Sequence, residues 1–430
     1  MKRLILVALD WTRPKDPPMS LGHASILANL LKNNIDVVEK SWSVNHENFQ
    51  SSDVVDFVMK NATKNSHFGI GAYVWNELHV QKIIKALKAS TFSGKIIIGG
   101  PQISYLKSNL EKYYPEANIF VRGYAENALT QYMLSSDSHP QIKGIHYANT
   151  PDMSQSAQAD LDSLPSPILN ELILPQNFIR WETQRGCPFK CSFCQHRESS
   201  LGGEALKRRN FGDSRIAAEI QWLSNNKIGD LAVLDPTFNS GPKHVEIINQ
   251  LNEHGFSGKI ALQIRPEMIK PDFMDAIIKL NQQAKVVLEF GLQTIHKNEM
   301  KLINRMNNLK KVEQAVADCK ANNIEVELSI IYGLPTQTLD SFKQTVEYCI
   351  DLKPNVLHAF PLMLLRGTEL YENKEKFGLV EGFETPQVTT IRQQDGIPHV
   401  IASPSFSTED WRKMANIADQ IEEMNETNAI

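Results

Sequence analysis

Three cysteines lie close together in the segment "ETQRGCPFKCSFCQHR", residues 182–197, in the pattern Cys187-x3-Cys191-x2-Cys194. Thiols at this spacing can pack in a core, bind zinc or hold an iron–sulfur cluster. Zinc prefers four ligands, and His196 would complete such a set. Three thiolates on a cubane cluster leave one iron open to a substrate or cofactor. The missing fourth cysteine therefore favours the cluster, with packing and zinc as the alternatives.

A block of alternating strands and helices must position this segment. Its buried runs predict strands, and its amphipathic runs predict helices. The strands are expected within 178–184, 230–235, 259–265, 285–292, 325–332 and 356–364, and helices lie between them, for example 214–226, 272–283, 309–322 and 340–351. Six strands in strict alternation with helices predict a partial (β/α)6 barrel of the TIM type. The cysteines follow the first strand, at the rim where barrels of this kind place their chemistry.

The first part of the chain shows the same alternation and predicts a separate α/β domain with a doubly wound parallel sheet. Strands are expected at 3–9, 67–75 and 94–100, and helices at 21–34 and 77–90. The sequence divides into this domain at 1–135, a linker at 136–175, the barrel at 176–375 and a small extension at 376–430 that ends in a polar helix, 408–428. The proline-rich residues 10–18 have no assigned role, although they could cover a cleft between the domains.

Composition bounds the function. The chain has 430 residues, 42% hydrophobic and 22% charged, with a net charge of −4, so no basic excess suggests a nucleic-acid partner. The apolar start is too short for a signal peptide, and no run approaches a membrane span. Five cysteines do not make a disulfide framework in a chain of this length, which predicts a reducing cytoplasm. Cys319 and Cys349 fall in amphipathic helices and are expected in the core.

The cysteine pattern, with Phe193 directly before the last cysteine, resembles that of the radical S-adenosylmethionine (SAM) superfamily. The resemblance covers nearly the whole chain. It implies a [4Fe–4S] cluster on the three cysteines of residues 187–194. The open iron would chelate the amino and carboxylate groups of SAM, and one electron would cleave SAM to methionine and a 5′-deoxyadenosyl radical. An electron donor such as a reduced flavodoxin or ferredoxin is implied as a partner.

The later strand ends match the family's SAM-binding segments. The resemblance implies SAM contacts at Phe193, Asp235, Thr237, Arg265, Glu289, Gln293, Arg305, Ile331, Tyr332 and Gly333. Chemically, a carboxylate and a hydroxyl suit the ammonium of SAM, and a guanidinium suits its carboxylate. Glu289 and Gln293 are four apart and are expected on one face of their strand. Asp235 could instead form a turn, and Arg265 could pair with Glu267 or Asp235.

The first domain resembles the Rossmann-like, cobalamin-binding domain of one subgroup of this family. The usual D-x-H-x-x-G motif is absent, because no aspartate stands two residues before His23 and "ASILAN" follows it. Members of the subgroup that lack this histidine fill the lower face of cobalt with apolar or aromatic side chains. The resemblance therefore implies cobalamin contacts in the strand-end loops, at Tyr73, Trp75, Gly99, Gly100, Gln102, Gly123 and Glu126.

With cobalamin, the expected activity is radical methylation of an unactivated carbon of a small molecule. Without cobalamin, the same frame would catalyse a rearrangement, a cyclisation or the transfer of another SAM fragment, such as aminocarboxypropyl. A cobalamin or iron–sulfur sensor that does not turn over is a third hypothesis, and it predicts no cleavage of SAM. The substrate itself, the oligomeric state and the role of the extension do not follow from the sequence.

Overall fold

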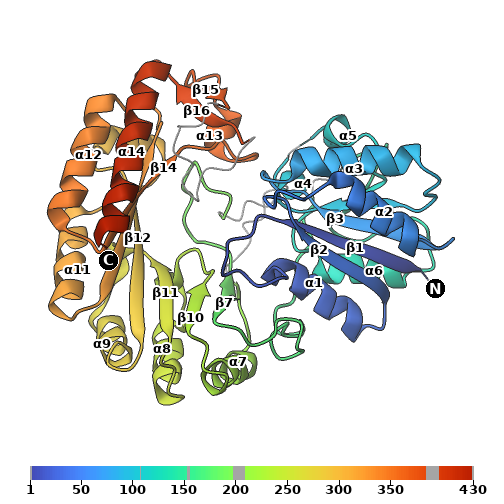
Figure 1. Ribbon diagram of the computed structural model, residues 1–430, viewed down its shortest axis with the longest axis horizontal. Helices are drawn as coiled ribbons and strands as arrows, with labels where there is room; N and C mark the ends of the chain where they lie inside the picture. The colour runs from blue at the N-terminus through green and yellow to red at the C-terminus, as the bar shows by residue number, and fades with distance from the viewer. Residues whose placement is uncertain (1, 107, 153–154, 197–208, 384–396, 429–430) are drawn as a thin grey trace. The chain divides into compact units, whose positions relative to one another are not determined.

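The computed structural model describes the whole chain except residues 1, 107, 153–154, 197–208, 384–396 and 429–430. The described residues form two compact units, one ending at Pro175 and the other beginning at Gln176. Both units are α/β, as the sequence predicts (Figure 1). No helix in the described ranges is long and apolar enough to cross a lipid bilayer.

A six-stranded sheet with the order β2-β1-β3-β4-β5-β6 forms the first unit. All neighbouring strands are parallel except β6, which runs antiparallel to β5. The direction of winding reverses between β1 and β3, and ligands of doubly wound sheets bind at such a switch point, outside the carboxyl ends of the strands. The strands are β1 Arg3–Asp10, β2 Asp36–Ser43, β3 Ser66–Gly71, β4 Ile96–Gly99, β5 Ile119–Val121 and β6 Ile145–Tyr147.

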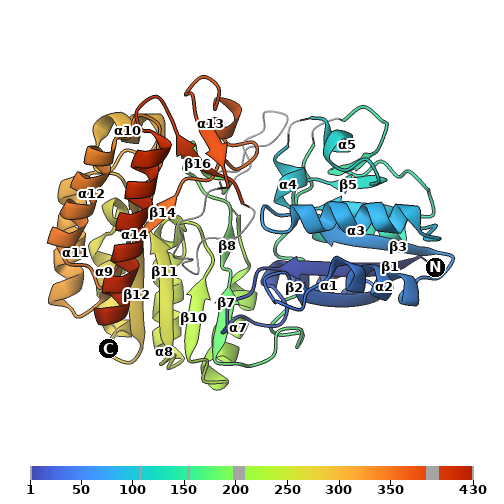
Figure 2. The same ribbon diagram turned by 45° about the horizontal axis from the view of Figure 1, so that its top comes forward.

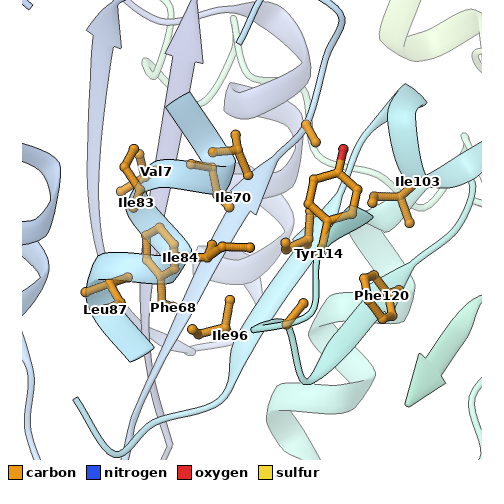
Figure 3. Packing of buried hydrophobic residues seen from close by; sticks show 14 of the residues in the cluster. Val7, Phe68, Ile70, Ile83, Ile84, Leu87, Ile96, Ile103, Tyr114 and Phe120 are labelled. Carbon is orange, nitrogen blue, oxygen red and sulfur yellow. The ribbon is translucent and has the colours of Figure 1, made fainter. Parts of the chain in front are cut away.

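Helices bury both faces of this sheet, so β1 is a continuous apolar run. Ile5 and Val7 belong to the core that includes residues of α2 and α3, which Figure 3 shows in part. Leu4 and Leu6 alternate with them and belong to the core that includes residues of α1 and α6. The helices are α1 Leu21–Lys32, α2 Ser51–Asn61, α3 Glu77–Ala89, α4 Pro101–Ser104, α5 Leu110–Tyr113 and α6 Ala125–Leu134.

Residues 136–175, interpreted above as a linker, belong to the first unit. β6 lies within this segment and adds the last strand of the sheet. Further along, Ala157 donates its N–H to Arg122 O at 2.8 Å and accepts from Tyr124 N at 3.2 Å. The sequence pattern does not predict these contacts, because a short antiparallel strand and single backbone hydrogen bonds produce no hydrophobic periodicity.

The strand expected at 67–75 ends earlier, at Gly71. Asn76 causes this end: its Nδ2 donates to Gly71 O at 3.1 Å and to Leu9 O at 2.9 Å, and its Oδ1 accepts from Tyr73 N at 2.8 Å. The buried amide thereby folds residues 72–76 into a loop across the ends of β3 and β1. The earlier loop at 10–18 is tied to the end of β2, since Thr12 and Asn45 exchange two hydrogen bonds.

Six parallel strands form the sheet of the second unit, in the order β14-β13-β12-β11-β10-β7. This confirms the predicted partial barrel, with β7 and β14 as its open edges. The strands are β7 Phe178–Trp181, β10 Asp230–Val233, β11 Lys259–Ile264, β12 Lys285–Gln293, β13 Glu325–Tyr332 and β14 Val356–Pro361. The helices that cover the outer face (Figures 1 and 2) are α7 Asp213–Asn225, α8 His244–Glu253, α9 Pro271–Leu280, α11 Leu309–Ala321 and α12 Leu339–Leu352.

The C-terminal extension closes the β14 edge of this barrel. Its polar helix α14, Thr408–Asn428, runs beside β14 (Figure 2). Asn425 accepts from Leu357 N at 3.2 Å and donates to Leu357 O at 2.7 Å. A single side chain thus satisfies edge backbone groups that would otherwise be open to another strand. The extension also holds two antiparallel strands, β15, Val380–Gly382, and β16, His399–Ala402.

Candidate functional site

The cysteine segment leaves the carboxyl end of β7 through the short strand β8, Gln184–Arg185. None of its three cysteines is part of a disulfide: Cys191 is buried, and Cys187 and Cys194 are half-buried. The described residues gather no three His, Cys, Asp or Glu side chains that could hold one metal ion. A cubane cluster does not require such a group, since it takes one thiolate on each iron.

Hydrogen bonds to the end of α10, Lys297–Leu302, fix this loop from one side. Ser192 donates through its N–H to Ile303 O at 2.9 Å and through its hydroxyl to Leu302 O at 2.8 Å. Asn304 Nδ2 donates to Lys190 O at 2.7 Å. These bonds pin the residues between the cysteines, so the positions of the thiols are set by the barrel rather than by the loop alone.

Asp235, at the end of β10, fixes the loop from the other side. It accepts hydrogen bonds from Thr183 N at 2.8 Å, from the Thr183 hydroxyl and from Gln184 N at 3.2 Å, and it is fully buried. Burial raises the pKa of this carboxyl to about 7. The resemblance implied a contact with the amino group of SAM. The structure instead uses both carboxyl oxygens to hold the start of the cysteine segment.

Thr237 lies closer to the thiols than Asp235 does. Its hydroxyl oxygen is 3.6 Å from Cys187 Sγ and donates to Pro236 O at 2.7 Å. Its carbonyl accepts from Gln184 Nε2 at 3.1 Å. The segment after β10 therefore contacts the beginning of the cysteine loop twice, once at a thiol and once at the residue preceding the motif.

Arg265 follows β11 and reaches the central cysteine. Its Nη2 lies 3.4 Å from Cys191 Sγ, and its guanidinium carbon lies 3.6 Å from the centre of the Phe189 ring. Asn239 holds the backbone of Arg265 through two hydrogen bonds, of 2.8 and 3.0 Å. The alternative for Arg265, an ion pair with Glu267 or Asp235, is not among the contacts found for the described residues.

Arg305, just after α10, approaches the same sulfur. Its Nη1 lies 3.8 Å from Cys191 Sγ, and its Nη2 donates to Gly291 O. Burial and the nearby charge of Arg305 lower the pKa of Arg265. Within the described chain, neither Arg265 Nε nor Arg305 Nε has a hydrogen-bond acceptor, although both atoms are buried. Two cations with unmatched donors beside thiols make a site for negative charge.

Gln293 joins this group through a bulge in β12. The pairing of β12 with β13 shifts between Gly291 and Gln293, and Gln293 has a φ of 68°. Simple alternation from Glu289 therefore does not place its side chain. Even so, a Cβ added to Gly291 would lie 2.6 Å from Gln293 Nε2, 3.3 Å from Arg305 Nη2 and 3.7 Å from Ser329 Oγ. Gln293 and Arg305 thus converge at Gly291, while Glu289 stays half-buried on the strand.

The remaining positions expected to contact SAM lie in two other places. Phe193 is half-buried within the cysteine loop. The ring of Tyr332 is fully buried against Phe342 and Trp411, in the layer between β13 and its covering helices. Only the backbone of Tyr332 is therefore available to a ligand on the inner side. Gly333 has a φ of 88°, and its N–H donates to Gln337 Oε1 at 2.7 Å.

Sequence reasoning missed Phe189 and Asn239, which fix Arg265, and Thr183, which binds Asp235. Phe189 carried a signal, because it stands inside the cysteine motif, where a large aromatic needs a partner. Asn239 and Thr183 carried none, since a polar residue near a strand end is compatible with many turns. Cys319 and Cys349 are fully buried, as expected, and burial raises the pKa of each thiol to about 12.

The first unit has an aromatic pair at its switch point. The rings of Tyr73 and Trp75 stack at 4.5 Å in the loop after β3, and Trp75 Nε1 donates to Leu9 O at 3.2 Å, at the end of β1. Both residues are half-buried. Burial and the charges of Asp10 and Glu126 raise the pKa of Tyr73 to about 12, so this hydroxyl stays neutral.

Four other residues expected at this rim serve internal packing. A Cβ on Gly100 would lie 2.5 Å from Ala72 O, and one on Gly123 would lie 2.4 Å from Ala157 O, so both glycines admit backbone rather than ligand. Gln102 donates a hydrogen bond to Glu77 at 2.8 Å. Glu126 is buried and accepts a hydrogen bond from Ser25 at 2.9 Å. Gly99 differs from Gly100 and Gly123, because a Cβ there would meet only ordinary contacts, at 3.6 Å or longer.

Comparison with known proteins agrees with this architecture. The sequence model of the radical SAM superfamily matches residues 181–349, from the end of β7 into α12. The chain is 25% identical over 339 residues to the cobalamin-dependent radical SAM methyltransferase TokK of Streptomyces tokunonensis. The matched residues make up 72% of this chain and 49% of TokK. It is 24% identical over 303 residues to 2-(S-pantetheinyl)-carbapenam-3-carboxylate methyltransferase of Streptantibioticus cattleyicolor, covering 64% of this chain and 44% of the relative. The chain thus spans about half the length of these relatives.

Among solved structures, the fold is similar to the radical SAM methyltransferase TsrM of Kitasatospora setae, with cobalamin and a [4Fe–4S] cluster bound in that structure. The TM-score is 0.73 at 13% identity, over 98% of this chain and 89% of TsrM. The likeness therefore extends over both units. Residues 181–349 thus match the radical SAM superfamily, and the fold of the chain is similar to that of a radical SAM methyltransferase.

Proposed function

We propose that the protein is a cobalamin-dependent radical SAM methyltransferase that acts on an unactivated carbon of a small molecule. The observation that carries this proposal is the cysteine motif on the barrel rim, where the buried Arg265 and the half-buried Arg305 both approach the sulfur of Cys191. The doubly wound unit with an aromatic switch point and the two methyltransferases that the sequence resembles support the cobalamin part.

The residues fit an iron–sulfur cluster. Cys187, Cys191 and Cys194 would hold it, and the cationic side chains at Cys191 would balance its negative charge. When bound, the cluster and SAM together supply one-electron cleavage of the sulfonium, and cobalamin supplies the methyl group. The unmatched Nε donors of Arg265 and Arg305 are available to the carboxylate of SAM. Gln293, beside Arg305, offers a neutral amide to the same ligand.

The loop after β3 would hold a corrin. Tyr73 and Trp75 offer a stacked, half-buried aromatic surface at the switch point, and Tyr73 stays neutral over the physiological range because its pKa is raised. Gly99 leaves room for close approach, unlike Gly100 and Gly123. No histidine ligand to cobalt is required in this arrangement, which agrees with the absence of the D-x-H-x-x-G pattern.

The proposed enzyme also needs an electron donor, a cellular location and a class of substrate. A reduced flavodoxin or ferredoxin would supply the electron. None of the five cysteines is part of a disulfide, which suits a reducing cytoplasm, where an open iron site is also protected. The similarity to a 2-(S-pantetheinyl)-carbapenam-3-carboxylate methyltransferase and the net charge of −4 both favour a small metabolite over a nucleic acid as substrate.

The test is anaerobic reconstitution of the full chain with iron, sulfide and hydroxocobalamin, followed by desalting and absorption spectroscopy. We expect a cluster shoulder, a retained corrinoid band, and cleavage of SAM after reduction. Cys191→Ala is expected to abolish the cluster, and Cys349→Ala, a buried cysteine outside the motif, serves as the matched control. A cluster without a corrinoid contradicts the methyltransferase, and a cluster that never cleaves SAM contradicts the radical enzyme.

A further inference from the structure

The three thiols of the site have unlike surroundings. Cys191 Sγ lies near two guanidinium groups, at 3.4 Å from Arg265 Nη2 and 3.8 Å from Arg305 Nη1. Cys187 Sγ instead lies 3.6 Å from the Thr237 hydroxyl. Cys194 Sγ accepts from the backbone N–H of His196 at 3.4 Å. Two guanidinium groups therefore lie beside the central sulfur.

Packing and hydrogen bonds hold the two guanidinium groups in these positions. Stacking on Phe189 and two backbone hydrogen bonds to Asn239 fix Arg265, which is 9% exposed. Donation to Gly291 O, within β12, anchors Arg305. Like charges placed this close repel each other, and negative charge beside them offsets the repulsion.

We propose that Arg265 and Arg305 are positioning residues that raise the reduction potential of the cluster through Cys191. The inference rests on the proposed function, because it takes the three thiols as the cluster's ligands. Reduction adds one electron, supplied by the reduced donor, and neither makes nor breaks a bond. Since the reduced cluster is more negative by one charge, hydrogen bonds from cations to its sulfur ligand favour the reduced form. This role differs from binding the carboxylate of SAM, because it needs no SAM.

The experiment is a redox titration of the reconstituted full chain without SAM, in which electron paramagnetic resonance measures the reduced fraction. The variants are Arg265→Gln and Arg305→Gln. Arg215→Gln is the matched control, because Arg215 also stacks on a phenylalanine, at 4.0 Å from Phe211, but lies on α7. We expect each site variant to lower the ratio of reduced to oxidised cluster about tenfold at a fixed potential, which is about 59 mV for one electron. The control should titrate like the wild type.

Several outcomes separate this inference from the function beneath it. A wild-type chain that assembles no cluster overturns the proposed function. A cluster whose midpoint is the same in both glutamine variants overturns the inference and leaves the function standing. A shift that arises only after SAM is added also overturns it, since the arginines would then act on the carboxylate of SAM. If a glutamine variant does not assemble a cluster, Arg265→Lys and Arg305→Lys retain the charge, and we expect a smaller fall in potential.

Discussion

Replacing Asp235 by asparagine tests the most buried charge of the site. The carboxyl is fully buried, and burial moves its pKa from an ordinary value of 3.8 to about 7. Each unit of pKa corresponds to about 1.4 kcal/mol, so the ionised carboxylate costs the folded protein about 4 kcal/mol. Asparagine carries no charge, and its Oδ1 can still accept from the backbone N–H groups of Thr183 and Gln184. Its Nδ2 can donate to the Thr183 hydroxyl.

The direction of the pH dependence follows from the raised pKa. Between about pH 4 and pH 7 the folded protein holds a proton at Asp235 that the unfolded chain has released. The contribution to the free energy of unfolding is therefore fully present below pH 4 and is lost as the pH rises to about 7. Asp235→Asn removes this loss. We expect the variant to exceed the wild type in stability at pH 8, and the advantage to grow by about 2–3 kcal/mol between pH 5 and pH 8.

Urea unfolding of the reduced, cluster-free chain, followed by circular dichroism at about pH 5, 6 and 8, measures this difference. Asp272→Asn, at an exposed position in the first turn of α9, is the control and should show no such trend. A variant that is less stable than the wild type at pH 8 would refute the reasoning. In that case the carboxylate must be ionised and stabilised by a partner, and burial would not dominate its energy.

Two further substitutions test the fold that supports the site. Gly123→Ala should lower the free energy of unfolding by about 2–4 kcal/mol in a denaturant titration, because its Cβ would lie 2.4 Å from Ala157 O at a φ of 80°. Gly255→Ala, with a φ of 70° but nothing within 4 Å, should cost only about 1 kcal/mol, and equal losses would contradict the packing argument. Asn425→Ala should cost about 1–3 kcal/mol and promote aggregation, measured by light scattering, because it uncovers the backbone of Leu357 on the edge of β14. Unchanged stability and solubility would show that α14 protects this edge without Asn425.

The elements that periodicity can reveal were predicted well. All six barrel strands and the helix at 408–428 follow from apolar runs and helical spacing. The strand β6 within residues 136–175 was not expected, because a three-residue antiparallel strand has no recognisable period. The end of β3 was misplaced because Asn76 stops the strand through contacts with a distant one, at Leu9.

The sequence by itself indicated an iron–sulfur cluster through the resemblance of its cysteine pattern to the radical SAM superfamily, because the spacing of three thiols is a local property of the chain. Only the tertiary structure decided what the side chains after the strand ends contact. Asp235 and Tyr332 were both matched to SAM by their positions in the sequence. In the structure the carboxyl of Asp235 holds the start of the cysteine segment, and the ring of Tyr332 packs in the core. Arg265 and Arg305 stand 40 residues apart in sequence, and only folding brings both guanidinium groups to the sulfur of Cys191. Side-chain direction depends on packing among distant segments, which no short stretch of sequence records.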